Sequence, residues 1–254
     1  MPGWYNRYLQ GFYLEVYDEL LEMDEQVFED NVYDEALSVA RAIMQRVRHN
    51  IELLIPRLEA MGYDFGAGFL DEFADNPKLL EEVMDDVPIF KPSTVETPER
   101  VTRLEQLVGL LPLSLKCWYE EVGGVNLIGL FPDIGGQEVH LRDGPVWDPL
   151  CIYPVELAIK MVTEHIKYGA WGPGSPLSLS PDRWFKYGFG GSGAYCISLP
   201  CKAFDAPLLL EEHDTTFINY LRICFRWGGF PGLESDHRFP RGQIEFLTKD
   251  MLPF

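Results

Sequence analysis

The sequence of 254 residues lacks any apolar run of the ~18 residues that a membrane-spanning helix requires. Its N-terminus also lacks the charged and then apolar pattern of a secretory signal peptide. Both absences predict a cytoplasmic protein with no membrane partner. Hydrophobic residues make up 46% of the chain, which is typical of a folded protein of one or two domains.

Motifs that mark common active sites are missing as well. No two of the five histidines lie three or four residues apart, and no C-x-x-C occurs, so no metal site is predicted. The glycine-rich stretch 188–193 lacks the Gly-Lys-Ser/Thr of a phosphate-binding loop. Its Ser192 lacks the G-x-S-x-G frame of a catalytic serine. We therefore predict no enzyme activity and no cofactor, and we interpret 188–193 as a turn that leads into a strand.

Cysteine is sparse, and its five copies are irregularly spaced: Cys117, Cys151, Cys196, Cys201 and Cys224. An odd count with no paired spacing does not suggest a disulfide framework. Most of these residues have apolar neighbours in the sequence. We expect reduced thiols that are mostly buried.

Positive charge is absent from residues 8–40, which contain ten carboxylates and no Lys or Arg. The whole chain has a formal net charge of −19. Such a charge repels nucleic acid and anionic membranes, whereas a basic protein is its natural complement. We take Asp18, Glu22, Glu25 and Glu29 as candidate partner-binding residues, with a merely solvated helix surface as the alternative interpretation.

Apolar spacing divides the chain into a helical first part and a mixed second part. Leu9, Tyr13, Val16 and Leu20 recur at helical intervals, and residues 34–61 show a long apolar stripe that Pro56 could break after Leu54. Later helices are predicted over 97–110, 113–122 and 154–167, from Asp214 or Thr215 onward, and over 241–251. Strands are predicted over 125–130, 139–141, 150–153, 177–179, 194–199 and 207–210.

This order predicts an α+β fold, in which an N-terminal helical region precedes a mixed, mostly antiparallel sheet flanked by helices. We place the division between an acidic helical region, 1–95, and an α+β domain, 96–254. The first region carries most of the net negative charge, because it has half of the carboxylates but far fewer Lys and Arg residues.

The second region resembles the SUKH superfamily, which includes the fungal cell-wall-assembly regulator and many bacterial immunity proteins. The resemblance begins with a helix ending in Leu111-Pro112, then an aromatic segment with Trp118 and Tyr119, and a Gly123-Gly124 turn into a strand. It continues in the glycine turn at 190–197 and the late helix at 217–222, and covers roughly 97–230.

The resemblance implies a non-catalytic protein-binding module, such as an immunity-like protein that neutralises a basic toxin. Two alternatives stay open. One is an intracellular regulatory or scaffold protein that binds an endogenous partner. The other is a hydrolase or nucleotide-binding enzyme with a composite site near the 188–193 loop. The sequence does not specify the oligomeric state or identify the partner.

Overall fold

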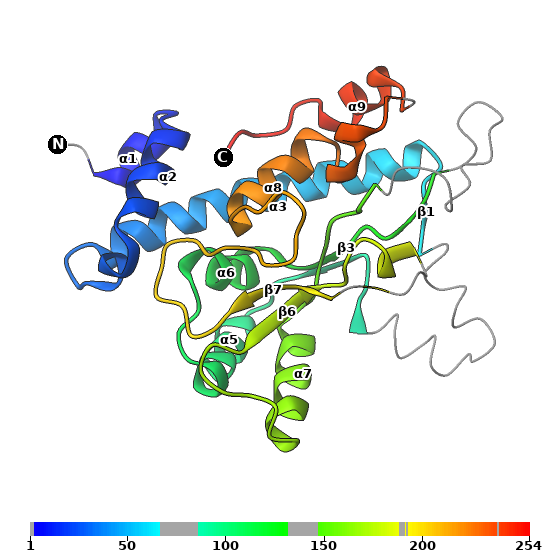
Figure 1. Cartoon of the computed structure of the whole chain (residues 1–254). Coiled ribbons are helices and arrows are strands. Elements are labelled where there is room, and N and C mark those ends of the chain that lie inside the picture. The colour runs from blue at the N-terminus through cyan, green and yellow to red at the C-terminus, as the bar shows by residue number, and fades with distance from the viewer. Residues whose placement is uncertain (1–2, 67–85, 132–146, 188–190, 192, 238) are drawn as a thin grey trace.

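The fold was analysed in a computed structural model that describes residues 3–66, 86–131, 147–187, 191, 193–237 and 239–254. Helices come first and small antiparallel sheets follow, so the chain has the predicted α+β class. Figure 1 shows the first two helices at one edge of the molecule and the strands on the other side of a long central helix.

The acidic N-terminal segment forms three short helices: α1 (Trp4–Leu9), α2 (Tyr13–Glu22) and the 3-10 helix η1 (Asp24–Phe28). Gly11 separates α1 from α2 with a φ of 101°, a left-handed conformation that favours glycine. Val16 and Leu20 are fully buried, as predicted. The predicted apolar face was wrong for Leu9, which is 52% exposed because the chain turns after α1 instead of continuing as one helix.

Helix α3 (Tyr33–Ala60) spans the molecule and buries the predicted stripe. Pro56 does not break it after Leu54, contrary to one expectation. Proline removes one N–H from the helix ladder. Pro56 lies on the exposed side of α3, where water can hydrate the carbonyl that loses its partner.

The next elements are α5 (Thr97–Val108), α6 (Leu113–Cys117), the π-helical turn η3 (Trp118–Val122) and β3 (Gly123–Asn126). The stop between α5 and α6 and the glycine turn into β3 agree with the predicted boundaries. Gly123 has a φ of 106°, and a Cβ there would lie 2.1 Å from the Lys91 carbonyl oxygen. Only glycine fits this close strand contact.

The strands of the described residues pair in three small antiparallel sheets. The first contains β1 (Asp64–Phe65) and β4 (Gly129–Leu130). In the second, β3 lies between β2 (Phe90–Pro92) and β5 (Cys151–Ile152). The third pairs β6 (Pro176–Ser180) with β7 (Tyr195–Ser198), with an irregularity between Ser178 and Ser180. The predicted strand at 207–210 makes isolated bridges, and the one at 139–141 lies outside the described residues.

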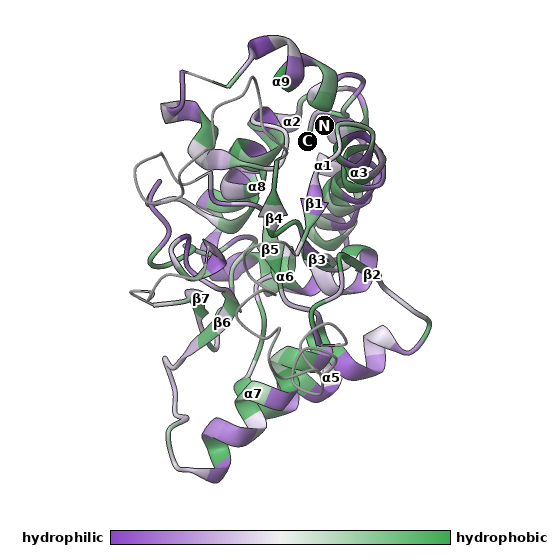
Figure 2. Cartoon of the chain, turned by 90° about the vertical axis from the view of Figure 1, so that its right-hand side faces the viewer, coloured by the Kyte–Doolittle hydropathy of each residue, from purple (hydrophilic) through white to green (hydrophobic). Residues whose placement is uncertain are grey.

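Further helices in the described part of the chain lie between or after these strands in the sequence. They are α7 (Val155–Lys167), η4 (Phe185–Tyr187), α8 (Phe217–Arg226), η5 (Pro231–Ser235) and α9 (Arg241–Thr248). Polar and apolar residues alternate along α5 and α7 in Figure 2. The residue before α8 is Thr216, whereas Asp214 or Thr215 was predicted to cap this helix.

One apolar cluster unites the two predicted regions. It joins Val16 and Leu20 of α2 and the buried stripe of α3 to Trp118, Phe204 and Phe217. The acidic N-terminal helices therefore pack directly on the sheet-containing part. The division of the chain into an acidic helical region, 1–95, and an α+β domain, 96–254, stays a prediction.

Candidate functional site

The four predicted partner-binding residues lie close together in the chain, on two successive helices and the residue that follows them. Asp18 and Glu22 belong to α2, Glu25 belongs to η1, and Glu29 follows η1 directly. All four are exposed. Within the described ranges, no hydrogen bond or ion pair engages their carboxylates. We call these four residues the acidic face.

A buried polar contact anchors the acidic face to the rest of the molecule. The hydroxyl of Tyr17 donates to Oδ2 of Asp205 over 3.0 Å and lies 2.6 Å from Oγ1 of Thr216. The same Asp205 oxygen accepts the backbone N–H of Ile218, 3.0 Å away in α8. The guanidinium of Arg222 covers the Tyr17 ring at 4.3 Å. α2 is thus fixed by residues almost 200 positions later in the chain.

Burial affects the titration of this anchor. It raises the pKa of Asp205, although the hydrogen bonds that the carboxylate accepts act in the opposite direction. Burial also raises the pKa of the Tyr17 hydroxyl, and the Asp205 charge adds to that shift. Tyr17 therefore stays a neutral donor at ordinary pH. The anchor is a positioning contact for α2.

A second contact holds α1 against α2. Arg7 forms a bidentate pair with Glu19, with distances of 2.6 and 2.7 Å to the two carboxylate oxygens. The indole N–H of Trp4 donates to Glu19 as well, over 2.9 Å. Bidentate pairing fixes both side chains in one geometry. As a result, the Arg7 guanidinium of α1 is already paired within the N-terminal segment.

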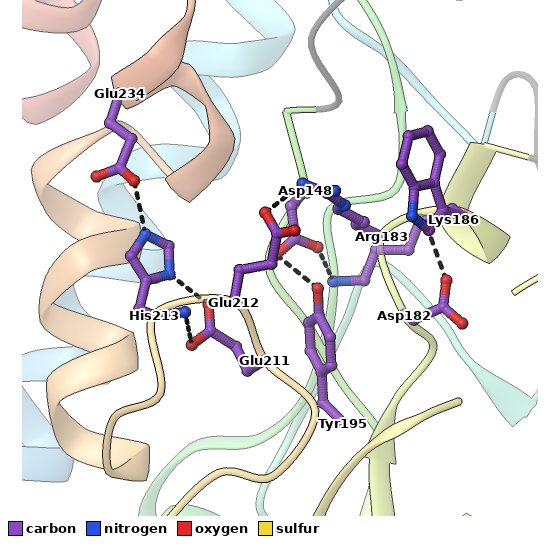
Figure 3. Close-up of polar contacts among 10 residues, drawn as sticks. Asp148, Asp182, Arg183, Lys186, Tyr195, Glu211, Glu212, His213 and Glu234 are labelled. Carbon is purple, nitrogen blue, oxygen red and sulfur yellow. Dashed lines mark hydrogen bonds and ion pairs between the residues drawn. The ribbon is translucent and has the colours of Figure 1, made fainter. Parts of the chain in front are cut away.

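A different polar cluster lies beside the glycine-rich stretch and is drawn in Figure 3. Nζ of Lys186 is fully buried and lies 2.5 Å from Oδ1 of Asp148. The hydroxyl of Tyr195 donates to the other Asp148 oxygen over 3.1 Å, and the ammonium lies 4.8 Å from the Tyr195 ring centre. A buried charge needs such partners to offset its desolvation. The Lys186 ammonium and the Asp148 carboxylate therefore balance each other's buried charge.

His213 forms the other half of the polar cluster. Its Nδ1 contacts Glu211, and its Nε2 lies 2.9 Å from Oε1 of Glu234 in η5. Burial lowers the pKa of His213, but the two carboxylates outweigh burial and raise it above its ordinary value. Burial raises the pKa of Glu211, against the opposing effect of His213. Since both ring nitrogens face carboxylates, the protonated form of His213 is favoured, and its side chain links two segments.

Asp182 organises the described ends of the glycine-rich stretch. Its Oδ1 accepts the N–H groups of Trp184 and Phe185, at 2.8 and 3.0 Å, and its Oδ2 accepts the N–H of Gly193 at 3.0 Å. Arg183 pairs with Glu212. Most of 188–193, including Ser192, lies outside the described residues. The alternative prediction of a composite enzyme site near this loop therefore stays untested.

The polar cluster offers little for acid–base or metal chemistry. A general base needs an unprotonated atom that faces substrate. His213 directs both nitrogens at carboxylates, and Lys186 is buried against Asp148. Among the described residues, no group of three or more His, Cys, Asp or Glu side chains is arranged to hold a metal ion. All five cysteines are free, and four are buried, as predicted.

Local sequence signals did not reveal these contacts. Asp148, Lys186 and Tyr195 come from three separate segments, and His213 lies 21 positions from Glu234. The one local hint is the Glu211-Glu212-His213 run, in which a histidine follows two carboxylates.

Comparisons with known proteins add no identity to this geometry. No family model matches the chain, and no curated protein or solved structure matches it either. In the part of the chain that the structure describes, every helix is too short or too polar to cross a bilayer.

Proposed function

We propose that the chain is a non-catalytic protein-binding module whose acidic face binds a basic protein. The observation that carries the proposal is the contrast in charge pairing. Asp18, Glu22, Glu25 and Glu29 are exposed and not ion-paired within the described ranges, whereas Glu19 between them is fixed by Arg7. Exposed charges on an anchored segment can steer a basic partner and set its orientation.

The resemblance to the SUKH superfamily supports a more specific version of this proposal. In that version, the partner is a secreted toxin that the chain neutralises as an immunity-like protein in the cytoplasm. An acidic inhibitor suits a basic toxin, because opposite potentials raise the association rate and disfavour wrong partners. A regulatory protein with a basic endogenous partner would use the same face.

The test compares two variants with the same change in charge. The first carries Asp18→Lys, Glu22→Lys, Glu25→Lys and Glu29→Lys. The control carries Glu59→Lys, Glu99→Lys, Glu164→Lys and Glu245→Lys, which lie exposed on α3, α5, α7 and α9. Each protein is used to capture partners from the native cell, and the captured proteins are quantified by mass spectrometry.

We expect a basic protein that is captured by wild type and by the control but depleted at least ~10-fold with the acidic-face variant. Rim charges act mainly on association, so the loss should be larger at low salt. Equal capture by both variants would show that the acidic face is only a solvated surface.

A further inference from the structure

Four large apolar side chains near the acidic face remain in contact with solvent. Tyr5 is 38% exposed, Leu9 52%, Phe12 47% and Leu14 59%. We call these four residues the N-terminal apolar patch. Single exposed apolar residues are common on protein surfaces, whereas a contiguous group of them often marks an interaction surface.

Helix geometry joins this patch to the acidic face. Tyr5 and Leu9 are four residues apart in α1, and Leu14, Asp18 and Glu22 follow one another at the same interval in α2. Residues four apart lie on the same side of a helix. The row that starts with exposed Leu14 therefore continues directly into the exposed carboxylates.

Carboxylates predominate around the patch, and the neighbouring cations already have partners: the Arg46 guanidinium lies over the rings of Tyr8 and Tyr13, and that of Arg222 lies over the Tyr17 ring. Residues 8–40 contain no Lys or Arg, and Arg7 is held by Glu19 in a bidentate pair. A segment that covers the apolar patch must therefore present cations beside its apolar side chains. An acidic segment would be repelled at the border.

The secondary structure of this region limits how a partner segment can bind. Residues 3–60 are all described and contain helices and turns, with no strand. Without an exposed strand edge, a partner cannot bind by adding a strand, so it has to be recognised through side chains. A helix that packs its apolar side on α1 and α2 meets this requirement.

We propose that the N-terminal apolar patch and the acidic face together bind an amphipathic basic helix of the partner. The inference rests on the proposed function and specifies its partner. Burial of the patch supplies most of the affinity, and the carboxylates select cations and set the orientation of the helix.

The test uses two labelled peptides of about 18 residues, long enough to form a helix on binding. One carries leucine at helical intervals of three and four, with lysine elsewhere. The other has the same composition in shuffled order and cannot form one apolar side. Fluorescence anisotropy with the full chain should give at least ~10-fold tighter binding of the amphipathic peptide, because only that peptide can cover the patch.

Variants separate the apolar from the charged contribution. The variant Leu9→Ser, Phe12→Ser, Leu14→Ser should bind the amphipathic peptide ~10-fold more weakly and the shuffled peptide as before. The matched control Ile166→Ser, Tyr168→Ser, Phe246→Ser removes exposed apolar groups elsewhere and should bind both peptides like wild type. Circular dichroism checks that both variants are folded.

The outcomes distinguish this inference from the proposed function. If the Leu9, Phe12 and Leu14 variant keeps wild-type affinity while the acidic-face reversal loses it, the inference is overturned and the proposed function stands. If the acidic-face reversal changes neither peptide's affinity, the proposed function fails first. Two other results would contradict a basic helix as the partner of the patch. One is a wild-type dimer that dissociates in the Leu9→Ser, Phe12→Ser, Leu14→Ser variant. The other is binding of the wild type to zwitterionic vesicles that this variant does not show.

Discussion

The acidic face and the polar cluster contain similar residue types but use them in opposite ways. In the polar cluster, Lys186 pairs with Asp148, and His213 lies between two carboxylates. In the acidic face, the carboxylates of Asp18 and Glu22 are exposed, with no ion pair among the described residues. The comparison indicates that charge is structural in the polar cluster and available for binding in the acidic face.

This contrast also separates two kinds of mutational effect. A buried charge that loses its partner is left desolvated, so removal of one member costs stability. An exposed carboxylate loses little when it is replaced, because water already satisfies it. The polar cluster should therefore respond in unfolding experiments, and the acidic face in binding experiments.

The largest effect is expected at the buried ion pair. The substitution Lys186→Met leaves Asp148 buried without its cation, and we expect the free energy of unfolding to fall by about 3–5 kcal/mol. Urea denaturation monitored by tryptophan fluorescence measures this loss. A decrease below about 1 kcal/mol would mean that the pair is not a structural element.

A second variant removes the unpaired charge that Lys186→Met creates. In the double variant Lys186→Met, Asp148→Asn, no carboxylate is left to be desolvated. Asparagine also tolerates the left-handed φ of 52° at position 148. The double variant should be more stable than Lys186→Met alone.

A smaller effect is expected at the anchor of α2. The substitution Tyr17→Phe removes a donor to buried Asp205 and should cost about 1–3 kcal/mol. It should also speed hydrogen exchange of the α2 amides, because α2 loses its fixed attachment. Tyr5→Phe, at an exposed ring, is the matched control and should change neither quantity. Unchanged exchange in α2 would contradict the anchoring role of Tyr17.

The His213 contacts predict a dependence on pH. The pKa of His213 is raised above 6.5 in the folded chain, so its stabilisation is complete below pH 6.5 and is lost as pH rises through the folded value. The raised pKa of Glu211 acts in the same direction. His213→Gln should cost about 1 kcal/mol at pH 6 and less at pH 9.

Equilibrium unfolding at the two pH values measures this difference. The control His49→Gln removes an exposed histidine and should show almost no difference between the two conditions. An equal cost of His213→Gln at both pH values would show that the link between Glu211 and Glu234 does not depend on an imidazolium.

The smallest effect on stability is expected at the acidic face itself. Each single reversal to Lys at Asp18, Glu22, Glu25 or Glu29 should change the free energy of unfolding by about 0.5 kcal/mol or less. Relief of like-charge repulsion at helical spacing would offset part of any loss. If the variant with all four reversals lost more unfolding free energy than Tyr17→Phe, these carboxylates would have a structural role. The contrast between the acidic face and the polar cluster would then be wrong.

The elements with a long and regular pattern were predictable from sequence. Helix α3 follows its apolar stripe, and α5 and β3 follow Pro98 and the glycine turn. The turn after α1 was not predicted, because Leu9 and Tyr13 are four residues apart, which is the spacing expected within a single helix. Apolar spacing alone does not show where a chain changes direction, so Leu9 was assigned to the wrong side.

The site was only partly predictable, for a physical reason. Exposed carboxylates are visible in the sequence because their density is local. The contacts of Asp148, Lys186 and Tyr195 join positions 38 and 47 residues apart, and no local pattern records which distant group will balance a buried charge. The SUKH-like partner and the toxin role stay predictions.

The contact between Tyr17 and Asp205 has a consequence for the order of folding. The two residues are 188 positions apart, so α2 obtains its final attachment only when the segment before α8 has been synthesised and has closed a very long loop. In a growing chain, the acidic segment is therefore present before the contact that anchors α2 to Asp205 can form. A partner that requires a rigid acidic face would therefore bind completed chains and pass over nascent ones.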